Sequence, residues 1–336
     1  MNKIILPVAV LIMPVFHCIS SFASKRISET GLNQKEIFTE GRNICSPAVR
    51  TDSVKTIAFY LQDGVEVLDF AGPMEVFAYA GYKVFTVSKT RDPIISQGIL
   101  KIVPDYDIVN APEADMLVFF GGNSGKASQD EELISWVKNR KNVQYYFSVC
   151  TGVFMLAEAG ILDGQKATTF HSSLDYLEQS FPKIKVLKGV RFVDNGKVIT
   201  TAGISAGIDG ALHMVAKLQG FGQAKRVAYY MEYDNWTPGN GVLSAENPYL
   251  TDRTAKDFLI YTGTYEFLKG ASLVIKSGTK GELTAVVNEG ETPLFYEKED
   301  KFFTGDGKYV KFQRDNNDKI AGYTLEGTDV LFKKKF

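Results

Sequence analysis

Short apolar runs alternate with helical stretches between residues 54 and 236. Residues 56–61 form an apolar run without polar alternation, as expected of a strand buried on both faces. Gly72 and Pro73 precede a helical stretch at 74–80, where Pro73 suits the first helical position and Gly81 the stop. The same pattern predicts strands at 82–87, 114–120 and 143–149 and helices at 131–138, 152–159, 172–181 and 208–218. This alternation predicts an α/β domain with a parallel sheet covered on both faces.

The pattern changes after Trp236. Residues 237–257 contain two prolines, two glycines and no periodicity, so we expect a linker there. Residues 258–336 show short alternating runs punctuated by glycines and no helical period. They predict a small antiparallel β-domain with hairpin turns.

The N-terminus has the pattern of a secretory signal. Lys3 precedes an apolar run at 4–16, and Ser21 and Ala23 match a small-residue cleavage rule. The run is shorter than the roughly 18–20 residues that span a bilayer. Cys18 could indicate a lipoprotein anchor, but His17 before it is not the small residue that such processing prefers. We therefore expect a cleaved signal peptide at 1–23, a leader at 24–53, and a periplasmic or secreted mature protein.

Composition narrows the class of function. Hydrophobic residues make up 45% of the 336 residues, enough for sizeable cores, and 38 basic residues nearly balance 39 acidic ones. This balance favours neither nucleic acid nor an anionic membrane as a partner. Metal-ligand spacing, a phosphate loop and a dinucleotide fingerprint are absent from the sequence, so we expect no metal and no cofactor. A small molecule is the expected partner.

The most informative segment surrounds Cys150. A buried strand runs into a helix there, and the small residues Ser148 and Gly152 flank the cysteine at −2 and +2. This spacing is typical of a nucleophile elbow with cysteine in place of serine. The helix N-terminus would lower the pKa of the thiol and favour the nucleophilic thiolate. The alternative is a small buried hydrophobic residue, as most free cysteines are.

Two further strand ends carry candidate chemistry. Asp69 follows the first strand, where ligands of open α/β sheets bind, and a carboxyl beside a thiol could donate a proton. The alternative for Asp69 is a cap on a helix that starts near Gly72. Gly121 and Gly122 follow another strand, and their amides could form an oxyanion hole with that of Thr151. The alternative for this glycine pair is a plain turn.

Taken together, these motifs resemble a known family. They occur in the order Leu68-Asp69-Phe70-Ala71-Gly72-Pro73, Gly121-Gly122, Ser148-Val149-Cys150-Thr151-Gly152, Leu162-Asp163-Gly164, Ala167-Thr168-Thr169 and Thr200-Thr201-Ala202-Gly203. From 54 to 236 the chain is similar to the ThiJ/PfpI family of the class I glutamine-amidotransferase-like superfamily. The most similar branch contains isonitrile hydratase and the amidase-like domains of AraC-type regulators. The resemblance implies a flavodoxin-like sandwich, a homodimer, Cys150 at the elbow, and required roles for Asp69 and Thr151.

The chain departs from this family at two places. Many relatives carry a histidine directly after the Ala-Thr-Thr strand, where this chain has Phe170, with His171 one residue later. A shift of one residue reverses side-chain direction at a strand end, so a catalytic role of His171 in a Cys–His dyad is a weaker expectation. His213 falls within the helix at 208–218, where a structural role is expected. The regulator branch carries a helix-turn-helix domain where this chain is β-rich, which argues against transcriptional regulation.

These observations favour a cysteine-dependent hydrolase or lyase that adds water to a small electrophilic carbon, similar to isonitrile hydratase. The alternative is a protein that senses oxidants or captures reactive carbonyls through Cys150 without turnover.

Cys45 lies in a polar segment before the predicted α/β domain, in a compartment that is expected to be oxidising. Pairing with Cys150 would abolish the nucleophile, so we expect Cys45 to be dispensable. Cys45→Ser should leave both the unfolding midpoint and the activity unchanged, and a large loss of either would contradict this.

Overall fold

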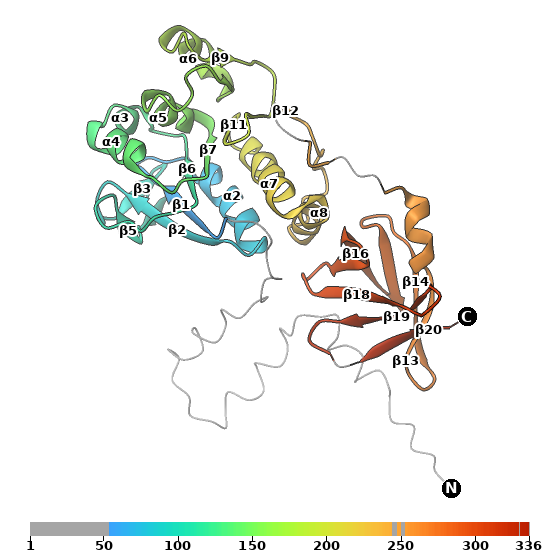
Figure 1. Ribbon diagram of the computed structural model, residues 1–336. Helices are drawn as coiled ribbons and strands as arrows, with labels where there is room; N and C mark the ends of the chain where they lie inside the picture. Colours follow the sequence, from blue (N-terminus) through green and yellow to red (C-terminus); the bar gives the residue numbers. More distant parts are fainter. Residues whose placement is uncertain (1–53, 244–246, 250–252, 329, 336) are drawn as a thin grey trace, which may run out of the picture. The chain divides into compact units, whose positions relative to one another are not determined.

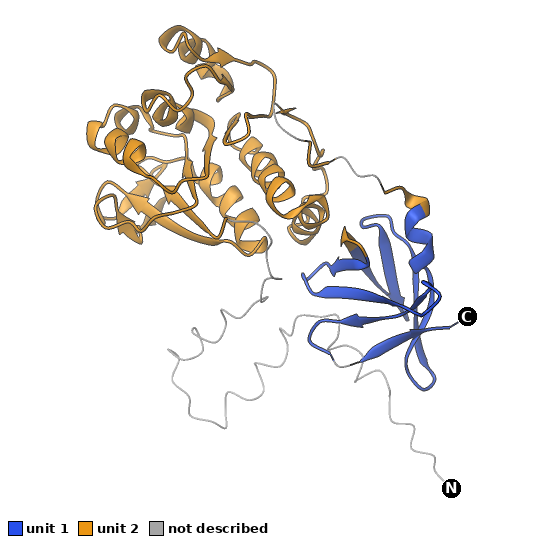
Figure 2. Cartoon of the chain, viewed as in Figure 1, with its two compact units in different colours: residues 1–48, 257–294, 300–336 blue, residues 49–256, 295–299 orange. Residues whose placement is uncertain are grey.

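The computed structural model describes residues 54–243, 247–249, 253–328 and 330–335 (Figure 1). The expected signal peptide, the leader and Cys45 lie outside the described residues. The described residues form two compact units, one of those between 54 and 256 with 295–299 and the other of those between 257 and 294 with those between 300 and 335 (Figure 2). Among these residues, none of the helices has the length and apolar character that a membrane span requires.

The first unit is built on an eight-stranded sheet. The strand order is β12 (Val242–Leu243), β10 (Phe192–Asp194), β11 (Val198–Thr201), β7 (Tyr145–Val149), β6 (Met116–Phe119), β1 (Thr56–Tyr60), β2 (Lys83–Ser88), β5 (Tyr106–Asp107). The strands from β11 to β5 are parallel, but β10 runs antiparallel to β11. The sheet is therefore mixed, and the prediction of a purely parallel sheet was wrong at this edge. Only residues 195–197 connect β10 to β11, and such a short connection allows only an antiparallel pair.

Helices cover both faces of this sheet, as predicted (Figure 1). One apolar core holds side chains of α2 (Val67–Tyr79), α7 (Ala206–Gln219) and α8 (Phe221–Tyr230). The other holds side chains of α3 (Gly125–Ser128), α4 (Glu131–Asn139), α5 (Val153–Glu158) and α6 (Leu174–Ser180). Two small two-stranded sheets, β3 (Ile94–Ser96) with β4 (Leu100–Ile102) and β8 (Lys166–Ala167) with β9 (Lys185–Val186), complete the unit.

The first helix begins earlier than predicted. It starts at Val67, so Pro73 lies inside it and not at its first position. Proline removes one backbone hydrogen bond there, which the burial of Phe70, Val76 and Phe77 compensates. The earlier start places Asp69 in the first helical turn.

A closed antiparallel barrel, which makes up most of the second unit and also includes residues 295–298, follows a 3₁₀ segment, η5 (Ala255–Tyr261). Its strands are β13 (Gly263–Leu268), β14 (Ala271–Ser277), β15 (Leu283–Val287), β16 (Gly290–Lys298), β17 (Lys301–Thr304), β18 (Tyr309–Arg314), β19 (Ile320–Leu325) and β20 (Leu331–Lys334). The pairing of β13 with β20 closes it, a non-local contact that the alternating pattern did not reveal. Packed aromatic rings fill the interior, among them Tyr261, Phe302 and Phe312.

Helix α7 packs closely on the sheet through Gly210. An added Cβ there would lie 2.4 Å from Thr201 Cγ2 and 3.1 Å from ring atoms of Phe147. Both neighbours are buried strand residues that cannot move aside without disturbing the sheet.

We expect Gly210→Ala to lower the free energy of unfolding by about 1–3 kcal/mol, the usual cost of overpacking. This cost exceeds the gain of about 1 kcal/mol that alanine brings to a helix. Urea unfolding followed by circular dichroism measures the change. Gly125→Ala is the matched control, because an added Cβ in α3 meets open space and should leave stability equal or slightly higher. Equal stability of Gly210→Ala and wild type would contradict the packing argument.

Candidate active site

Cys150 occupies a sharp turn between β7 and α5. Its φ of +58° lies in the left-handed region, which a residue other than glycine rarely adopts. A 3₁₀ turn, η3 (Cys150–Gly152), then leads into α5. A Cβ on Gly152 would lie 2.3 Å from the carbonyl oxygen of Phe119 on β6, so only glycine fits there. Strand, strained residue and closely packed glycine form the geometry expected of a nucleophile elbow.

Neighbouring segments hold the strained backbone of Cys150 on two sides. Its N–H donates to the carbonyl oxygen of Ala202 at 3.1 Å, at the end of β11. Its carbonyl oxygen accepts a hydrogen bond from Thr169 Oγ1 at 2.7 Å. Left-handed conformations that cost of order 1–3 kcal/mol persist where such contacts impose them, which is common at functional sites.

Asp69 is fully buried in the first turn of α2. Its Oδ2 accepts the N–H of Gly121 and its Oδ1 accepts the N–H of Ile204, each at 2.9 Å. Both donors lie far from α2 in the sequence, and Glu66 is the residue that precedes the helix. Asp69 therefore holds two other loops and does not cap its own helix, so the helix-cap alternative is wrong.

The Asp69 carboxyl group and the Cys150 thiol lie close enough for each to shift the pKa of the other. Gly121 lies against both. A Cβ on it would be 2.7 Å from Cys150 Sγ and 2.8 Å from Asp69 Oδ2. The structure thus brings together Cys150, Asp69 and Gly121 from three separate strand ends.

Burial sets the protonation of this pair. It raises the pKa of Asp69 from 3.8 to about 6, although the two backbone amides oppose the rise. Burial, followed by the negative charge of Asp69, raises the pKa of the Cys150 thiol to about 12. The expected lowering of the thiol pKa is therefore not found. The amide of Thr151 favours the thiolate, but burial and the neighbouring carboxylate outweigh it.

The remaining backbone donors are arranged differently from the expectation. The amide of Gly121 is already bonded to Asp69 and cannot serve as a free oxyanion donor. In the part of the chain that the structure describes, the Gly122 amide has no acceptor. Thr151 lies beside the thiol, and its Oγ1 accepts a hydrogen bond from Ser124 Oγ at 2.8 Å. Thr151 and Gly122 are therefore the candidates to hold an attacked group.

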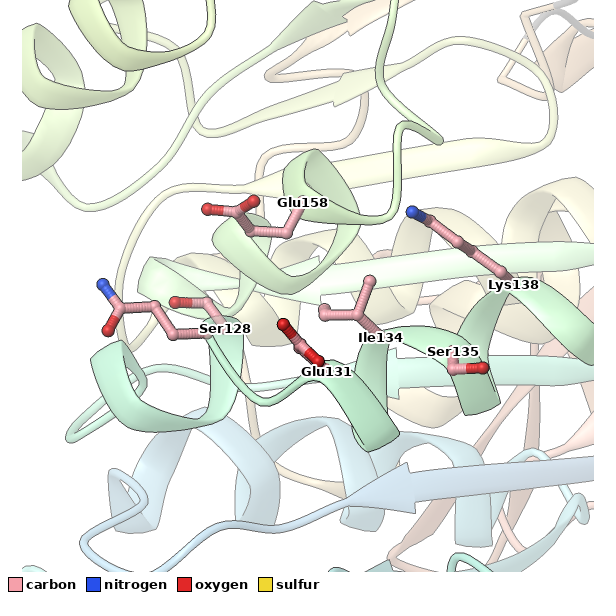
Figure 3. Close-up of a pocket in the computed structure, with 7 residues that line it drawn as sticks. Ser128, Glu131, Ile134, Ser135, Lys138 and Glu158 are labelled. Atoms are coloured by element: carbon pink, nitrogen blue, oxygen red, sulfur yellow. The ribbon is translucent and has the colours of Figure 1, made fainter.

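A pocket of about 600 Å³ lies elsewhere on the first unit (Figure 3). It is lined by Ser128, Gln129, Glu131, Ile134, Ser135, Lys138 and Glu158. Glu158 is the last residue of α5, whereas Cys150 precedes the first residue of that helix. The pocket is thus at the far end of α5, and it does not include the candidate nucleophile, whose exposed fraction is 6%.

Neither of the two described histidines is hydrogen-bonded to the pair. His171 is exposed on a 3₁₀ turn, and its ring packs on Phe170 with centroids 4.3 Å apart. Among the described residues it makes no hydrogen bond to Cys150 or Asp69.

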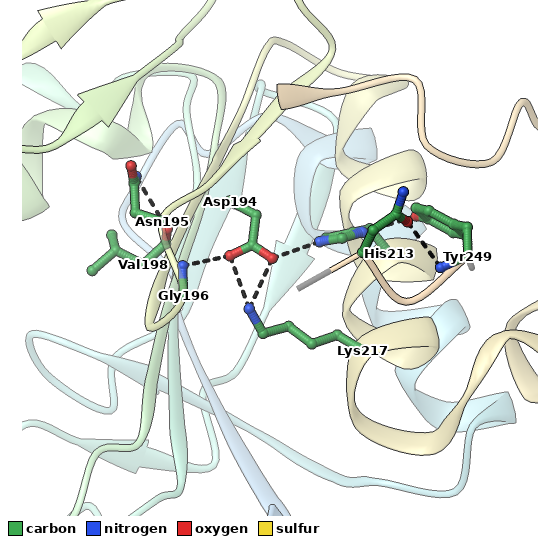
Figure 4. A network of polar contacts seen from close by, with 8 residues as sticks. Asp194, Asn195, Gly196, Val198, His213, Lys217 and Tyr249 are labelled. Atoms are coloured by element: carbon green, nitrogen blue, oxygen red, sulfur yellow. Dashed lines mark hydrogen bonds and ion pairs between the residues drawn. The ribbon is translucent and has the colours of Figure 1, made fainter. Parts of the chain in front are cut away.

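His213 is fully buried in α7, within a polar network (Figure 4). Its Nε2 is 2.8 Å from Asp194 Oδ2 and its Nδ1 is 2.8 Å from Tyr249 Oη. Lys217 donates to both oxygens of Asp194 at 2.8 and 2.9 Å. Burial alone would raise the pKa of Asp194, but these donors hold it below its usual value. The network joins β10, α7 and the segment that follows α8, which suits a structural role.

Sequence and structural similarity to known proteins agrees with this geometry. Residues 55–217 match the model of the DJ-1/PfpI family. The chain is 33% identical over 180 residues to isonitrile hydratase of Pseudomonas putida, covering 53% of this chain and 78% of that protein. The chain belongs to the DJ-1/PfpI family. A crystal structure of a ThiJ/PfpI family protein from Pseudomonas syringae is 33% identical, with a TM-score of 0.51 over 58% of this chain and 85% of that one.

The chain also matches a transcriptional regulator. The HTH-type transcriptional regulator CdhR of Pseudomonas aeruginosa is 27% identical over 169 residues, which are 48% of this chain and 50% of the regulator. These two matches each cover about half of this chain.

The described residues contain no group of three or more His, Cys, Asp or Glu side chains that could hold a metal ion.

The raised pKa of Asp69 predicts how stability changes with pH. The folded state binds the proton of Asp69 more tightly than the unfolded state, so wild type loses stability as pH rises from about 4 to about 7. A shift of about 2 pKa units corresponds to about 3 kcal/mol. Asparagine cannot ionise. The unfolding free energy of wild type minus that of Asp69→Asn should therefore fall by about 2 kcal/mol between pH 4 and pH 7, because the unfolded carboxyl is already partly ionised at pH 4.

Urea unfolding of both proteins at pH 4, 5, 6 and 7 measures this difference. Other titrating groups are common to the two proteins and cancel. A difference that stays constant, or that rises with pH, would show that burial does not raise the pKa of Asp69.

Proposed function

We propose that this protein is a cysteine-dependent enzyme that adds water to a small electrophilic carbon, similar to isonitrile hydratase. The observation that carries the proposal is the close approach of the buried Cys150 thiol and the buried Asp69 carboxyl, which both lie against Gly121 and shift each other's pKa. Both groups resist ionisation there, so near neutral pH the pair holds one proton and one negative charge. Such a pair can pass a single proton between sulfur, carboxylate and substrate.

The first step forms a covalent intermediate. For an isonitrile substrate, Cys150 Sγ attacks the terminal carbon while its proton passes to the Asp69 carboxylate. Asp69 then donates that proton to the same carbon. The product is a thioimidate in which sulfur and hydrogen have both added to the carbon, and Asp69 is again a carboxylate.

Water completes the cycle. Asp69 accepts one proton as a water oxygen attacks the thioimidate carbon, and the proton that remains on the added oxygen passes to the nitrogen as the carbonyl forms. The tetrahedral intermediate breaks its carbon–sulfur bond, the sulfur regains the proton held by Asp69, and an N-substituted formamide leaves. The sum is one isonitrile plus one water giving one formamide, with no oxidant or reductant. Thr151 and the Gly122 amide would hold the attacked group in place.

The geometry supports turnover over sensing. Oxidation of a cysteine by peroxides follows thiolate character and exposure. The Cys150 thiol is 6% exposed, and burial raises its pKa. A stoichiometric oxidant or carbonyl sensor is therefore the less favoured function.

Two expectations from the sequence extend the proposal. Residues 1–23 contain a positive charge, an apolar run and small residues at the expected cleavage site. This signal-peptide pattern supports export to the periplasm or the medium. The family resemblance supports a homodimer as the working form. Size-exclusion chromatography with light scattering and fractionation of expressing cells would test these two points.

Cyclohexyl isocyanide is the test substrate. We expect wild type to release the formamide over many turnovers between pH 5 and pH 9, and Cys150→Ala to release none. Asp69→Asn should lose at least about 10²-fold in turnover, the contribution typical of general acid–base catalysis. Removing the charge of Asp69 should also lower the pKa of the Cys150 thiol, so the variant should react faster than wild type with iodoacetamide at pH 7.

Chromatography of the formamide and mass spectrometry of the alkylated thiol provide the two readouts. Full turnover by Asp69→Asn would remove its proposed role. Absence of formamide from wild type across the pH range would remove the isonitrile assignment.

A further inference from the structure

The turn after β11 presents a strained residue to Asp69. Ile204 has a φ of +55°, an uncommon conformation for a β-branched side chain. Its N–H donates to Asp69 Oδ1 at 2.9 Å. Ile204 is 36% exposed, so it is not locked in the apolar core. Other contacts must impose this conformation, since it costs of order 1–3 kcal/mol.

Arg191, just before β10, is bonded to both ends of this turn. Its carbonyl oxygen accepts the N–H of Ala202 at 2.9 Å, and the carbonyl oxygen of Ala202 accepts the N–H of Cys150. Its guanidinium donates to Ser205 Oγ from both terminal nitrogens, at 3.2 and 3.3 Å. The strained residue, Ile204, lies between these two attachment points.

The guanidinium is itself fixed in orientation. Arg191 Nε donates to Asp209 Oδ2 at 2.7 Å, and a terminal nitrogen lies 2.7 Å from the same oxygen. Asp209 is 7% exposed in the first turn of α7, and its other oxygen accepts a hydrogen bond from Tyr233 Oη at 3.0 Å. Because the buried Asp209 carboxylate holds the planar guanidinium of Arg191, the N–H groups that remain point in one direction, toward Ser205. A lysine ammonium could not reproduce this arrangement.

We propose that Arg191 is a positioning residue for the active site: it holds the turn at 202–205 so that the Ile204 amide remains aimed at the Asp69 carboxyl. This inference rests on the proposed role of Asp69 as proton carrier. Arg191 acts through the turn and does not need to touch substrate. Its own charge is directed at Asp209, whereas Asp69 is faced by Cys150 and Glu66 and by the amides of Gly121 and Ile204.

Loss of the Arg191 guanidinium removes the attachment at Ser205, while the main-chain bond to Ala202 remains, and should let the turn relax. Asp69 would then lose one of the amide donors that stabilise its carboxylate, and its pKa would rise further. Arg191→Met should lower kcat with cyclohexyl isocyanide by about tenfold or more, as small misplacements of catalytic groups do. The acid limb of its pH profile should move to higher pH. Ser205→Ala should produce a smaller shift in the same direction, and Arg191→Lys should not restore wild-type values.

Arg140→Met is the matched control. Arg140 pairs with Glu113 at 3.0 Å, and its side chain is 10% exposed, but neither residue contacts the turn or the pair. It should retain the kcat and pH profile of wild type. If Arg191→Met fails to fold, Ser205→Ala carries the test, because it keeps the ion pair with Asp209.

A second readout does not depend on turnover. The rate at which iodoacetamide alkylates Cys150 should rise with pH and level off near the pKa of Asp69, because the two groups share one proton. Arg191→Met and Ser205→Ala should move this inflection to higher pH, even if wild type proves inactive on isonitriles. Inflections and acid limbs equal to those of wild type in both variants would overturn the inference.

Discussion

The first unit depends on one constraint: a carboxyl and a thiol meet in its buried interior. Asp69 is fully buried and Cys150 nearly so, and each resists the charge of the other. The surrounding backbone accommodates this unfavourable pairing. The amides of Gly121 and Ile204 donate to the carboxylate, and the Thr151 amide favours the thiolate. Cys150 and Ile204 also have left-handed φ values. The residues with strained backbone are therefore the ones that form or contact the charged pair.

The order of the sheet explains how the two groups meet. Strands β7, β6 and β1 are adjacent and parallel, so their carboxyl ends lie side by side. Cys150 follows β7 and Asp69 lies beyond β1. Gly121 follows β6 between them, where a side chain would collide with both. The position between the two groups thus requires a glycine. Ligand sites in such sheets generally lie at the carboxyl ends of the strands, as this pair does.

Local patterns in the sequence predicted much of this arrangement, and non-local contacts account for what they missed. The elbow at Cys150 depends on its immediate neighbours, so spacing revealed it. Asn195-Gly196 is a hairpin signal that could have indicated the antiparallel β10–β11 pair. The closed barrel depends on a contact between β13 and β20, about seventy residues apart. The pKa of the thiol depends on burial and on Asp69, which lies in a different loop, so a helix-terminus argument gave the wrong direction.

The same electrostatics limit the chemistry that the pair performs well. A shared proton and one negative charge in a dry site favour a neutral electrophile, since an anionic substrate would add a second unpaired charge at the cost of burial. An isonitrile is neutral, and each step proposed for it moves a proton within hydrogen-bond reach of Asp69. Total charge in the site therefore stays constant from thiol to thioimidate to formamide. Burial makes release of a free thiolate unfavourable, so the thiol proton stays with the Cys150–Asp69 pair. The pair can therefore add both sulfur and that proton to the same carbon.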